Sequence, residues 1–231
     1  MNGSSKHFDT LIEALKNLYW EVLHPIEERA ILKNWWSFGG GTALAMFHFG
    51  HRKSFDIDIF ISESQVFDFL NPKWYIDESR IFDTSMYKFD AMNHHIQLKT
   101  RNEIKVDFLL HESMVKKPLL NQKIALDFPL YYESVEDIIG KKIKWRKEDN
   151  LTRDIFDLAV AIHHDANIVK HLVESRFITY GDIEKLFLSL EKLDRKKYLL
   201  ELEKIEPQGA IYQAIAPDAK SIIQDNIARV L

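Results

Sequence analysis

The spacing of hydrophobic and polar residues separates a first part with strand-like alternation from a second part with helical periods. Apolar residues recur at helical spacing over residues 9–33, which predicts one or two helices with a kink or boundary at Pro25. Over residues 55–61 apolar and polar positions alternate strictly, which predicts a strand. Asp56 and Asp58 share one face of that strand.

Two further patterns complete the strand-rich part. A short apolar run at residues 36–38 leads into Gly39-Gly40-Gly41, and residues 42–49 then show a helical pattern ended by Gly50. This order predicts a strand, a glycine turn and a short helix. Residues 95–100 and 103–110 are two strand-like runs separated by Arg101-Asn102, which predicts an antiparallel hairpin.

Beyond Ser134 helical periods continue to Leu231. The pattern therefore predicts an α+β protein, with a mixed β-sheet flanked by helices in residues 1–132 and a C-terminal helical bundle in residues 133–231. No Gly/Ser-rich linker separates these two predicted domains.

Composition narrows the class of protein. The 231 residues are 46% hydrophobic and 12% aromatic, enough for one sizeable core, and the net charge of −4 gives the whole chain no strong attraction to nucleic acid. A polyanion must therefore meet a local basic patch.

The sequence has no cysteine, which excludes disulfides and thiol chemistry and fits a cytoplasmic protein. No run of about 18 apolar residues occurs, so we expect neither secretion nor a membrane span.

The carboxylates on the strand at residues 55–61 are the first candidate site. Asp56 and Asp58 leave one face about 7 Å apart, and two buried like charges are costly unless a cation lies between them. Asp107 lies on the polar face of the run at residues 103–110 and joins the pair if the two strands are neighbours. Oxygen ligands of this kind suit two magnesium ions shared with substrate phosphates. The alternative is a solvated strand face.

The glycine turn is the second candidate site. Gly40 and Gly41 precede a helix whose first N–H groups can hold a phosphate, and the Thr42 hydroxyl can donate to it. The turn lacks the Gly-Lys-Ser/Thr ending of a Walker A loop. Taken alone, it could also be no more than a tight turn.

A basic segment supplies the local patch that the net charge lacks. Lys142 and Arg146 lie at positions i and i+4, so on a helix they share a face that could meet a triphosphate or an RNA backbone. Asp154 and Asp157 then lie near the start of the next predicted helix, where carboxylates also stabilise the helix dipole. The six positive charges of the segment are Lys141, Lys142, Lys144, Arg146, Lys147 and Arg153, partly offset by Glu148 and Asp149.

The order of these motifs resembles the AbiEii/AbiGii-type toxin nucleotidyltransferases, a family of the polymerase-beta-like nucleotidyltransferase superfamily. The resemblance rests on residues 40–44, 50–54 and 56–60, and on a second block at residues 135–143 and 153–158. It covers roughly residues 37–161, whereas the later helices match only in general character.

The resemblance implies an enzyme that transfers a nucleotide from an NTP, with the Gly-Gly-Thr turn gripping the triphosphate and Asp56 and Asp58 binding magnesium. It places an NTP-contacting lysine at Lys142, with Lys141 as the alternative, and an aspartate needed for activity at Asp154 or Asp157. The second domain would complete the active-site cleft. Asp107 fits the superfamily pattern less closely.

The resemblance further implies a toxin of an abortive-infection or toxin–antitoxin system that modifies the 3′ end of tRNA and is countered by a cognate antitoxin. A protein or a small molecule is the alternative acceptor. A nucleotide-binding regulatory module without turnover is the alternative from another class, and retention of both Asp56 and Asp58 argues against it. The basic segment favours RNA over a small molecule.

Overall fold

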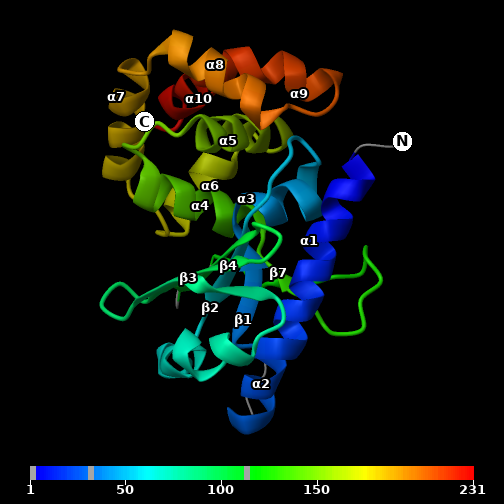
Figure 1. The fold of residues 1–231 in the computed structure, drawn as a ribbon. Coiled ribbons are helices and arrows are strands. Elements are labelled where there is room, and N and C mark those ends of the chain that lie inside the picture. Colours follow the sequence, from blue (N-terminus) through cyan, green and yellow to red (C-terminus); the bar gives the residue numbers. More distant parts are fainter. Residues whose placement is uncertain (1–3, 31–33, 112–114) are drawn as a thin grey trace. The chain divides into compact units, whose positions relative to one another are not determined.

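The computed structural model describes residues 4–30, 34–111 and 115–231, which form two compact units (Figure 1). The sheet unit comprises Met1–Met46, Phe55–Ser113 and Pro118–Glu133. The helical unit comprises Phe47–Ser54, Met114–Lys117 and Ser134–Leu231. Two short stretches of the helical unit are thus inserted in the sequence of the sheet unit.

Among the described residues, the sheet unit contains a mixed sheet of seven strands in the order β3-β4-β5-β2-β1-β7-β6. β2 runs parallel to β5 and β1 runs parallel to β7, while the other neighbouring pairs are antiparallel. The strands are β1 (Trp36–Gly39), β2 (Ile57–Ile61), β3 (Phe82–Asp90), β4 (His95–Thr100), β5 (Lys105–Leu110), β6 (Leu119–Leu120) and β7 (Tyr131–Tyr132).

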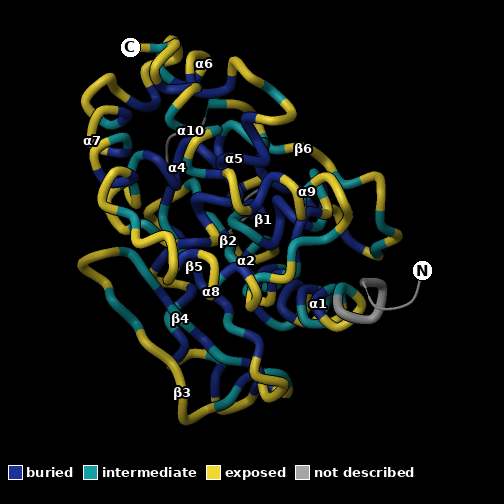
Figure 2. The backbone as a smooth tube through the Cα atoms, turned by 90° about the horizontal axis from the view of Figure 1, so that it is seen from above, coloured by how far each residue is buried: buried dark blue, intermediate teal, exposed yellow. Residues whose placement is uncertain are grey.

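The predicted strand at residues 55–61 is confirmed as β2, but it begins two residues later than the alternation suggests. Its pairing with β5 starts where Ile57 lies opposite Val106, and the preceding Phe55 is 55% exposed. The predicted hairpin is confirmed as β4 and β5, which pair antiparallel. No alternation predicted β3, an edge strand that is mostly exposed (Figure 2), so neither of its faces needs an apolar pattern.

The first predicted helical region is α1 (Ser4–Leu18), a π-helical turn (Tyr19–Leu23) and α2 (His24–Ala30). Pro25 is the second residue of α2 and directly follows the π-helical turn, which agrees with the predicted boundary because proline cannot donate a backbone hydrogen bond. Residues 31–33 of the predicted helix lie outside the described residues.

Glu27 fixes this helical region to the sheet. Its carboxylate accepts hydrogen bonds from Tyr19 Oη at 3.1 Å and from Trp36 Nε1, at the start of β1, at 2.9 Å. The Tyr19 ring also stacks on Phe128 with centroids 4.2 Å apart. The sheet unit also contains the short helix α3 (Gly40–Ala43), which runs on into a π-helical segment (Leu44–Phe49), and 3-10 turns at Ser64–Leu70, Pro72–Trp74 and Ile76–Glu78.

The predicted helical C-terminal part is confirmed, and α5 forms its centre. Ten of the thirteen residues of α5 are buried, and it contacts α4, α6, α8, α9 and α10 (Figures 1 and 2). No helix in the described ranges is long and apolar enough to cross a membrane. The helices are α4 (Val135–Arg146), α5 (Thr152–His164), α6 (Ile168–Glu174), α7 (Tyr180–Glu191), α8 (Arg195–Ile205), α9 (Ala210–Ile215) and α10 (Ala219–Ala228), with a 3-10 turn at Ala216–Asp218.

Candidate active site

The glycine turn brings the backbone against a carboxylate of the neighbouring strand. β1 ends at Gly39, opposite Asp58 on β2, and the short helix α3 (Gly40–Ala43) begins at the next residue. Gly40 has φ of +66°, and a Cβ atom placed on it would lie 1.9 Å from Asp58 Oδ2. Only glycine satisfies both the left-handed backbone and this close approach. The predicted strand–turn–helix is confirmed, with the helix starting at Gly40 and continuing to Phe49 as a π-helical segment.

Thr42 lies in the first turn of this helix and is completely buried. Its hydroxyl is therefore not exposed to a ligand, in contrast to the backbone around Gly40 and Gly41, which is only partly covered. A phosphate contact from Thr42 would require the helical turn to open.

The sheet places Asp107 beside Asp58. β2 and β5 are parallel neighbours, and Asp58 and Asp107 are partners in their register. Side chains at paired positions leave the same face of a sheet, so the two carboxylates share a face. The condition that Asp107 joins the strand carboxylates only if the strands are neighbours is therefore met. Asp56 comes directly before β2, and both Asp56 and Asp58 are half-buried.

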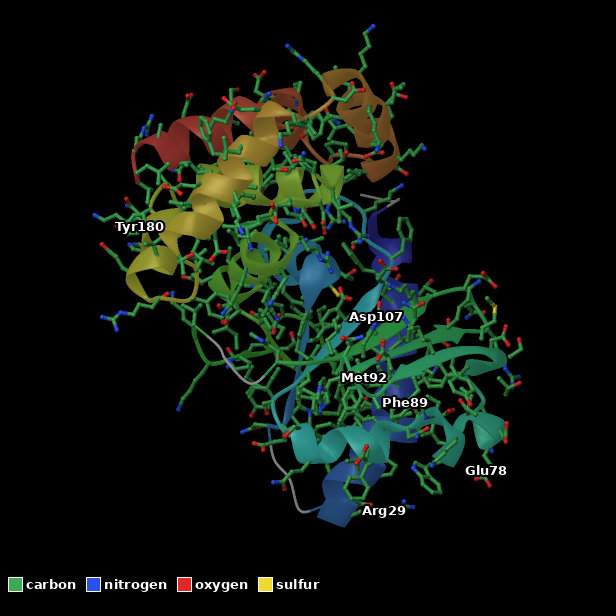
Figure 3. The ribbon with its side chains drawn as sticks, turned by 90° about the vertical axis from the view of Figure 1, so that its left-hand side faces the viewer. Arg29, Glu78, Phe89, Met92, Asp107 and Tyr180 are labelled. Atoms are coloured by element: carbon green, nitrogen blue, oxygen red, sulfur yellow. The ribbon has the colours of Figure 1, made fainter. Side chains whose placement is uncertain are left out.

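Three side chains hold the buried carboxylate of Asp107, which Figure 3 labels on β5. Lys105 Nζ lies 2.6 Å from Oδ2, while His95 Nε2 and Gln97 Nε2 lie 2.7 and 3.0 Å from Oδ1. Burial acts to raise the pKa of Asp107, but the hydrogen bonds from Lys105, Gln97 and His95 outweigh it and lower that pKa below its ordinary value. Asp107 is therefore ionised and has its charge balanced by Lys105.

The donor set of this face fits magnesium only in part. Asp56 and Asp58 supply partly exposed carboxylate oxygens, and magnesium is commonly held by one or two carboxylates together with substrate phosphates and water. Within the described ranges, however, no group of three or more His, Asp or Glu side chains lies close enough to hold a metal ion. Asp56 and Asp58 are thus suitable ligands, whereas Asp107 has its oxygens directed to other donors.

No sequence pattern singles out Glu133, yet it lies at the same turn. It follows β7, its backbone N–H donates to the Phe38 carbonyl at 2.9 Å, and its side chain is buried. A Cβ atom on Gly39 would lie 2.1 Å from Glu133 Oε2 and 2.5 Å from the ring of Phe60, which shares a face with Asp58. The strand that positions Glu133 has only two residues, too few for a detectable alternation.

In the helical unit, Asp157 is the centre of a buried charge cluster. Arg52 binds it through two hydrogen bonds, Nε to Oδ1 at 2.6 Å and Nη2 to Oδ2 at 2.9 Å. His51 Nε2 lies 2.7 Å from Oδ1, and Lys142 Nζ lies 3.1 Å from Oδ2. All four side chains are at least nine-tenths buried. Within the segment at residues 50–54, Arg52 therefore compensates the charge of Asp157 and His51 adds a hydrogen bond.

The protonation states follow from these contacts. Burial would raise the pKa of Asp157, but Arg52 and Lys142, together with the hydrogen bond from His51, hold it well below its ordinary value. Burial lowers the pKa of His51, so its imidazole is neutral and Nε2–H donates to Asp157. Asp157 is therefore ionised at neutral pH and binds these side chains within the helical unit.

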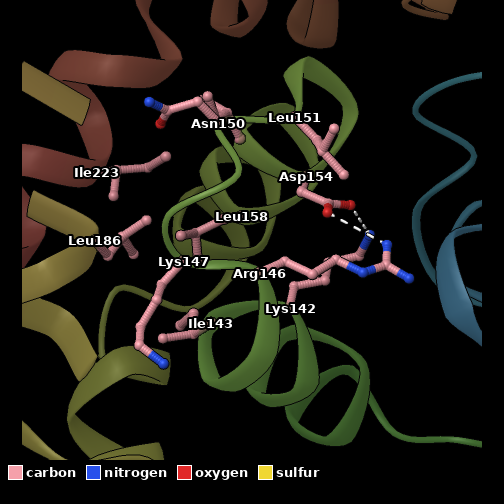
Figure 4. A pocket seen from close by; sticks show the side chains of 11 residues that line it. Lys142, Ile143, Arg146, Lys147, Asn150, Leu151, Asp154, Leu158, Leu186 and Ile223 are labelled. Atoms are coloured by element: carbon pink, nitrogen blue, oxygen red, sulfur yellow. Dashed lines mark hydrogen bonds and ion pairs between the residues drawn. The ribbon is translucent and has the colours of Figure 1, made fainter. Parts of the chain in front are cut away.

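Asp154 shares Lys142 with Asp157, and Figure 4 shows its contacts with Lys142 and Arg146. Its carboxylate accepts a hydrogen bond from Lys142 Nζ and lies 3.4 Å from Nη1 of Arg146, a side chain that is 42% exposed. Burial would raise the pKa of Asp154, but Lys142 and Arg146 lower it below its ordinary value. The prediction that Lys142 and Arg146 share a helical face is confirmed by this common partner.

A narrow recess adjoins these residues. Polar side chains of Lys142, Arg146 and Asp154 line one side, and apolar side chains, including Ile143 and Leu186, line the other (Figure 4). The volume of the recess is about 20 Å³, which is enough for a water molecule and far too small for a nucleotide. This recess is therefore not a nucleotide pocket.

Comparisons with known proteins agree with this assembly of motifs. A family profile described as the nucleotidyl transferase AbiEii toxin of type IV toxin–antitoxin systems matches residues 27–226. Curated protein sequences contain no match.

Two solved structures from Helicobacter pylori show a similar fold. JHP933 from Helicobacter pylori is 15% identical, with a TM-score of 0.52 over 100% of this chain and 94% of that chain. A second Helicobacter pylori structure is 14% identical, with a TM-score of 0.51 over 100% of this chain and 95% of that chain. MenT4, a nucleotidyltransferase toxin of Mycobacterium tuberculosis, is 13% identical over 94% and 92% of the two chains, with a TM-score of 0.47.

At such low identities the structural likeness concerns the fold alone. The family profile goes further, because it spans most of the chain and includes the glycine turn, the strand carboxylates and the Asp157 cluster. The chain belongs to the AbiEii family of nucleotidyl transferase toxins of type IV toxin–antitoxin systems.

Proposed function

We propose that this nucleotidyltransferase is a cytoplasmic toxin that moves a nucleoside monophosphate from an NTP to the 3′ end of tRNA, depends on magnesium and is countered by a cognate antitoxin. The observation that supports a phosphate-transfer site most strongly is the approach of the Asp58 carboxylate to the Gly40 turn. A carboxylate beside the N–H groups of a helix start suits a metal ion and a phosphate bound next to each other.

Asp56 and Asp58 are the proposed magnesium ligands of the chain. Two magnesium ions would neutralise charge on the phosphates and favour ionisation of the attacking hydroxyl. Asp107 is the third proposed ligand, and the Lys105 ammonium now occupies the position of its counter-cation. Asp107 Oδ2 has one donor among these contacts, Lys105, so it could bind a metal ion beside this ammonium group or in exchange for it.

The backbone N–H groups of Gly40 and Gly41 and the side chain of Lys142 are the proposed phosphate contacts. Lys142 now pairs with Asp154 and Asp157, so a phosphate would compete with these two carboxylates for its ammonium group. We assign the exchange to Asp154, because Asp157 also holds His51 and Arg52 in the interior. Asp157 would then be a positioning residue, and Asp154 the aspartate that responds to substrate.

The proposed reaction is an in-line displacement. A hydroxyl oxygen of the acceptor bonds to the α-phosphorus, the bond from that phosphorus to the bridging oxygen breaks, pyrophosphate leaves and the hydroxyl proton passes to solvent. Positioning and charge neutralisation would supply most of the rate enhancement. RNA is the preferred acceptor because the basic segment on α4 includes partly exposed cations such as Arg146.

Incubation of the protein with magnesium, each α-labelled NTP in turn and total tRNA tests the proposal. Label should enter tRNA with the native protein, and chelation of divalent cations should abolish transfer. Asp58→Asn should also abolish it, whereas Asp77→Asn, a matched change at an exposed aspartate of the same unit, should not. Label in the protein itself would contradict the tRNA acceptor. Full activity of Asp58→Asn would contradict the metal site.

A further inference from the structure

Trp145 projects from the basic helix α4 without being absorbed into the core. Its side chain is 55% exposed, and Lys144 Nζ lies 5.6 Å from its ring centroid. The same ammonium group lies 4.8 Å from the ring of Phe177. A cation over aromatic rings is attracted to their faces, so this ammonium group is held close to both rings.

Phe177 supports Trp145 from beneath. The two rings meet edge to face with centroids 6.4 Å apart, and Phe177 is 6% exposed. Phe177 can approach α4 because residue 140 is glycine, since a Cβ atom there would lie 2.7 Å from the Phe177 ring. Gly140, Trp145 and Phe177 all belong to the helical unit, in which α4 contacts α7 (Figure 1). The exposed indole therefore stands on a packed base.

The charges around Trp145 are mainly positive. Lys144 and Arg146 are its neighbours in α4, and the exposed Arg176 precedes its supporting ring. The exposed acidic residues Glu148 and Asp149 follow at the end of the helix. An exposed aromatic ring with cations on several sides suits a nucleobase, whose ring stacks on the indole while its phosphates meet the cations.

Trp74 in the sheet unit provides a contrast. It is 67% exposed, and Lys73 Nζ lies 4.4 Å from its ring centroid. Its positive neighbours are Lys73 and Arg29, and its negative neighbours are Asp68, Asp77 and Glu78. Carboxylates thus outnumber cations around Trp74, which does not favour a polyanion, so exposure of an indole does not by itself make a nucleic-acid site.

We propose that Trp145, with Lys144 and Phe177, forms a stacking platform for an unpaired base of the RNA acceptor. This inference rests on the proposed RNA-directed function and assigns it a binding residue in the helical unit. Trp145 acts in recognition of the acceptor and takes no part in binding the NTP.

Binding of a short fluorescein-labelled single-stranded oligoribonucleotide to the full chain tests the platform. Trp145→Ala should raise the Kd about tenfold, because loss of one stacked base typically weakens binding by roughly five- to 150-fold. Trp145→Phe should restore most of the affinity, since a phenyl ring still stacks. Trp74→Ala is the matched control and should leave the Kd unchanged, and NTP affinity should be the same in all variants.

The outcomes separate the platform from the proposed reaction. A Kd for Trp145→Ala within twofold of the native value, or an equal loss in Trp74→Ala, would overturn the platform. A tenfold loss confined to Trp145→Ala would support it even if labelled nucleotide entered no tRNA, in which case only the proposed reaction fails. If Trp145 instead binds a protein, the Kd of Trp145→Ala for the oligoribonucleotide should stay within twofold of the native value.

Discussion

Replacement of Asp157 by asparagine should destabilise the protein strongly although the side chain keeps its shape. The change removes the charge that Arg52 and Lys142 share, and both of these side chains are at least nine-tenths buried. Removing one partner of a buried ion pair typically costs about 3–5 kcal/mol. For a chain of this size such a loss corresponds to a decrease in Tm of roughly 10 °C.

Asp154→Asn is the matched control. Lys142 keeps Asp157 as a partner in that variant, and the other cation at Asp154, Arg146, is 42% exposed, so solvent screens its charge. The expected loss is about 1–2 kcal/mol. Urea unfolding followed by circular dichroism, with the native protein alongside, compares the free energies of unfolding of the three proteins.

The pH dependence provides a second test of the same reasoning. The pKa of Asp157 is lower in the folded than in the unfolded protein, so its contribution is fully present above the unfolded value of about 3.9 and is lost as the pH falls towards the folded value. The stability difference between the native protein and Asp157→Asn should therefore narrow below about pH 4. Equal stability of the two at pH 7, or a difference that stays constant on acidification, would refute this account of the cluster.

Three further predictions concern the proposed site. Gly40→Ala should reduce nucleotide transfer at least tenfold, because the added methyl group meets Asp58. Gly50→Ala is the control and should change mainly stability, since Gly50 has a similar positive φ but no atom within 4 Å of an added Cβ. Equal losses of transfer in the two variants would contradict the role of the contact with Asp58. Lys142→Gln should weaken NTP binding about tenfold in calorimetric titrations, and an unchanged Kd would exclude a phosphate contact. Arg146→Ala should lower RNA affinity and reduce the slope of log K against log salt by about one, so an unaltered slope would place this side chain away from RNA phosphates.

Local patterns in the sequence predict the elements of the fold better than their arrangement. The alternation that ends at Ile61 predicts β2, and the glycine triplet predicts the turn to a helix, because both depend on neighbouring residues. The pairing of Asp58 with Asp107 could not be predicted from the sequence, because hydrogen bonds between strands far apart in the chain produce no periodic pattern of residues. The exposed edge strand β3 lacks the apolar face that would reveal it.

The charge cluster around Asp157 also depends on contacts between distant residues, which the sequence does not reveal. Arg52 and Asp157 are 105 positions apart, and a hydrophilic residue is ordinarily expected at the surface. The sequence alone could not show that His51 and Arg52 are buried partners of Asp157. Family resemblance identifies both motifs, but the contacts explain why they occur together, because a fully buried carboxylate requires compensating cations.

The inserted segment Phe47–Ser54 limits how this protein can be divided or recombined. A fragment that starts at Ser134 contains Asp157 but lacks His51 and Arg52, and it would bury a carboxylate with Lys142 as a remaining partner. Deletion of this eight-residue segment should therefore destabilise the C-terminal helices. The charge balance of the helices after Ser134 is thus encoded partly in the first half of the sequence.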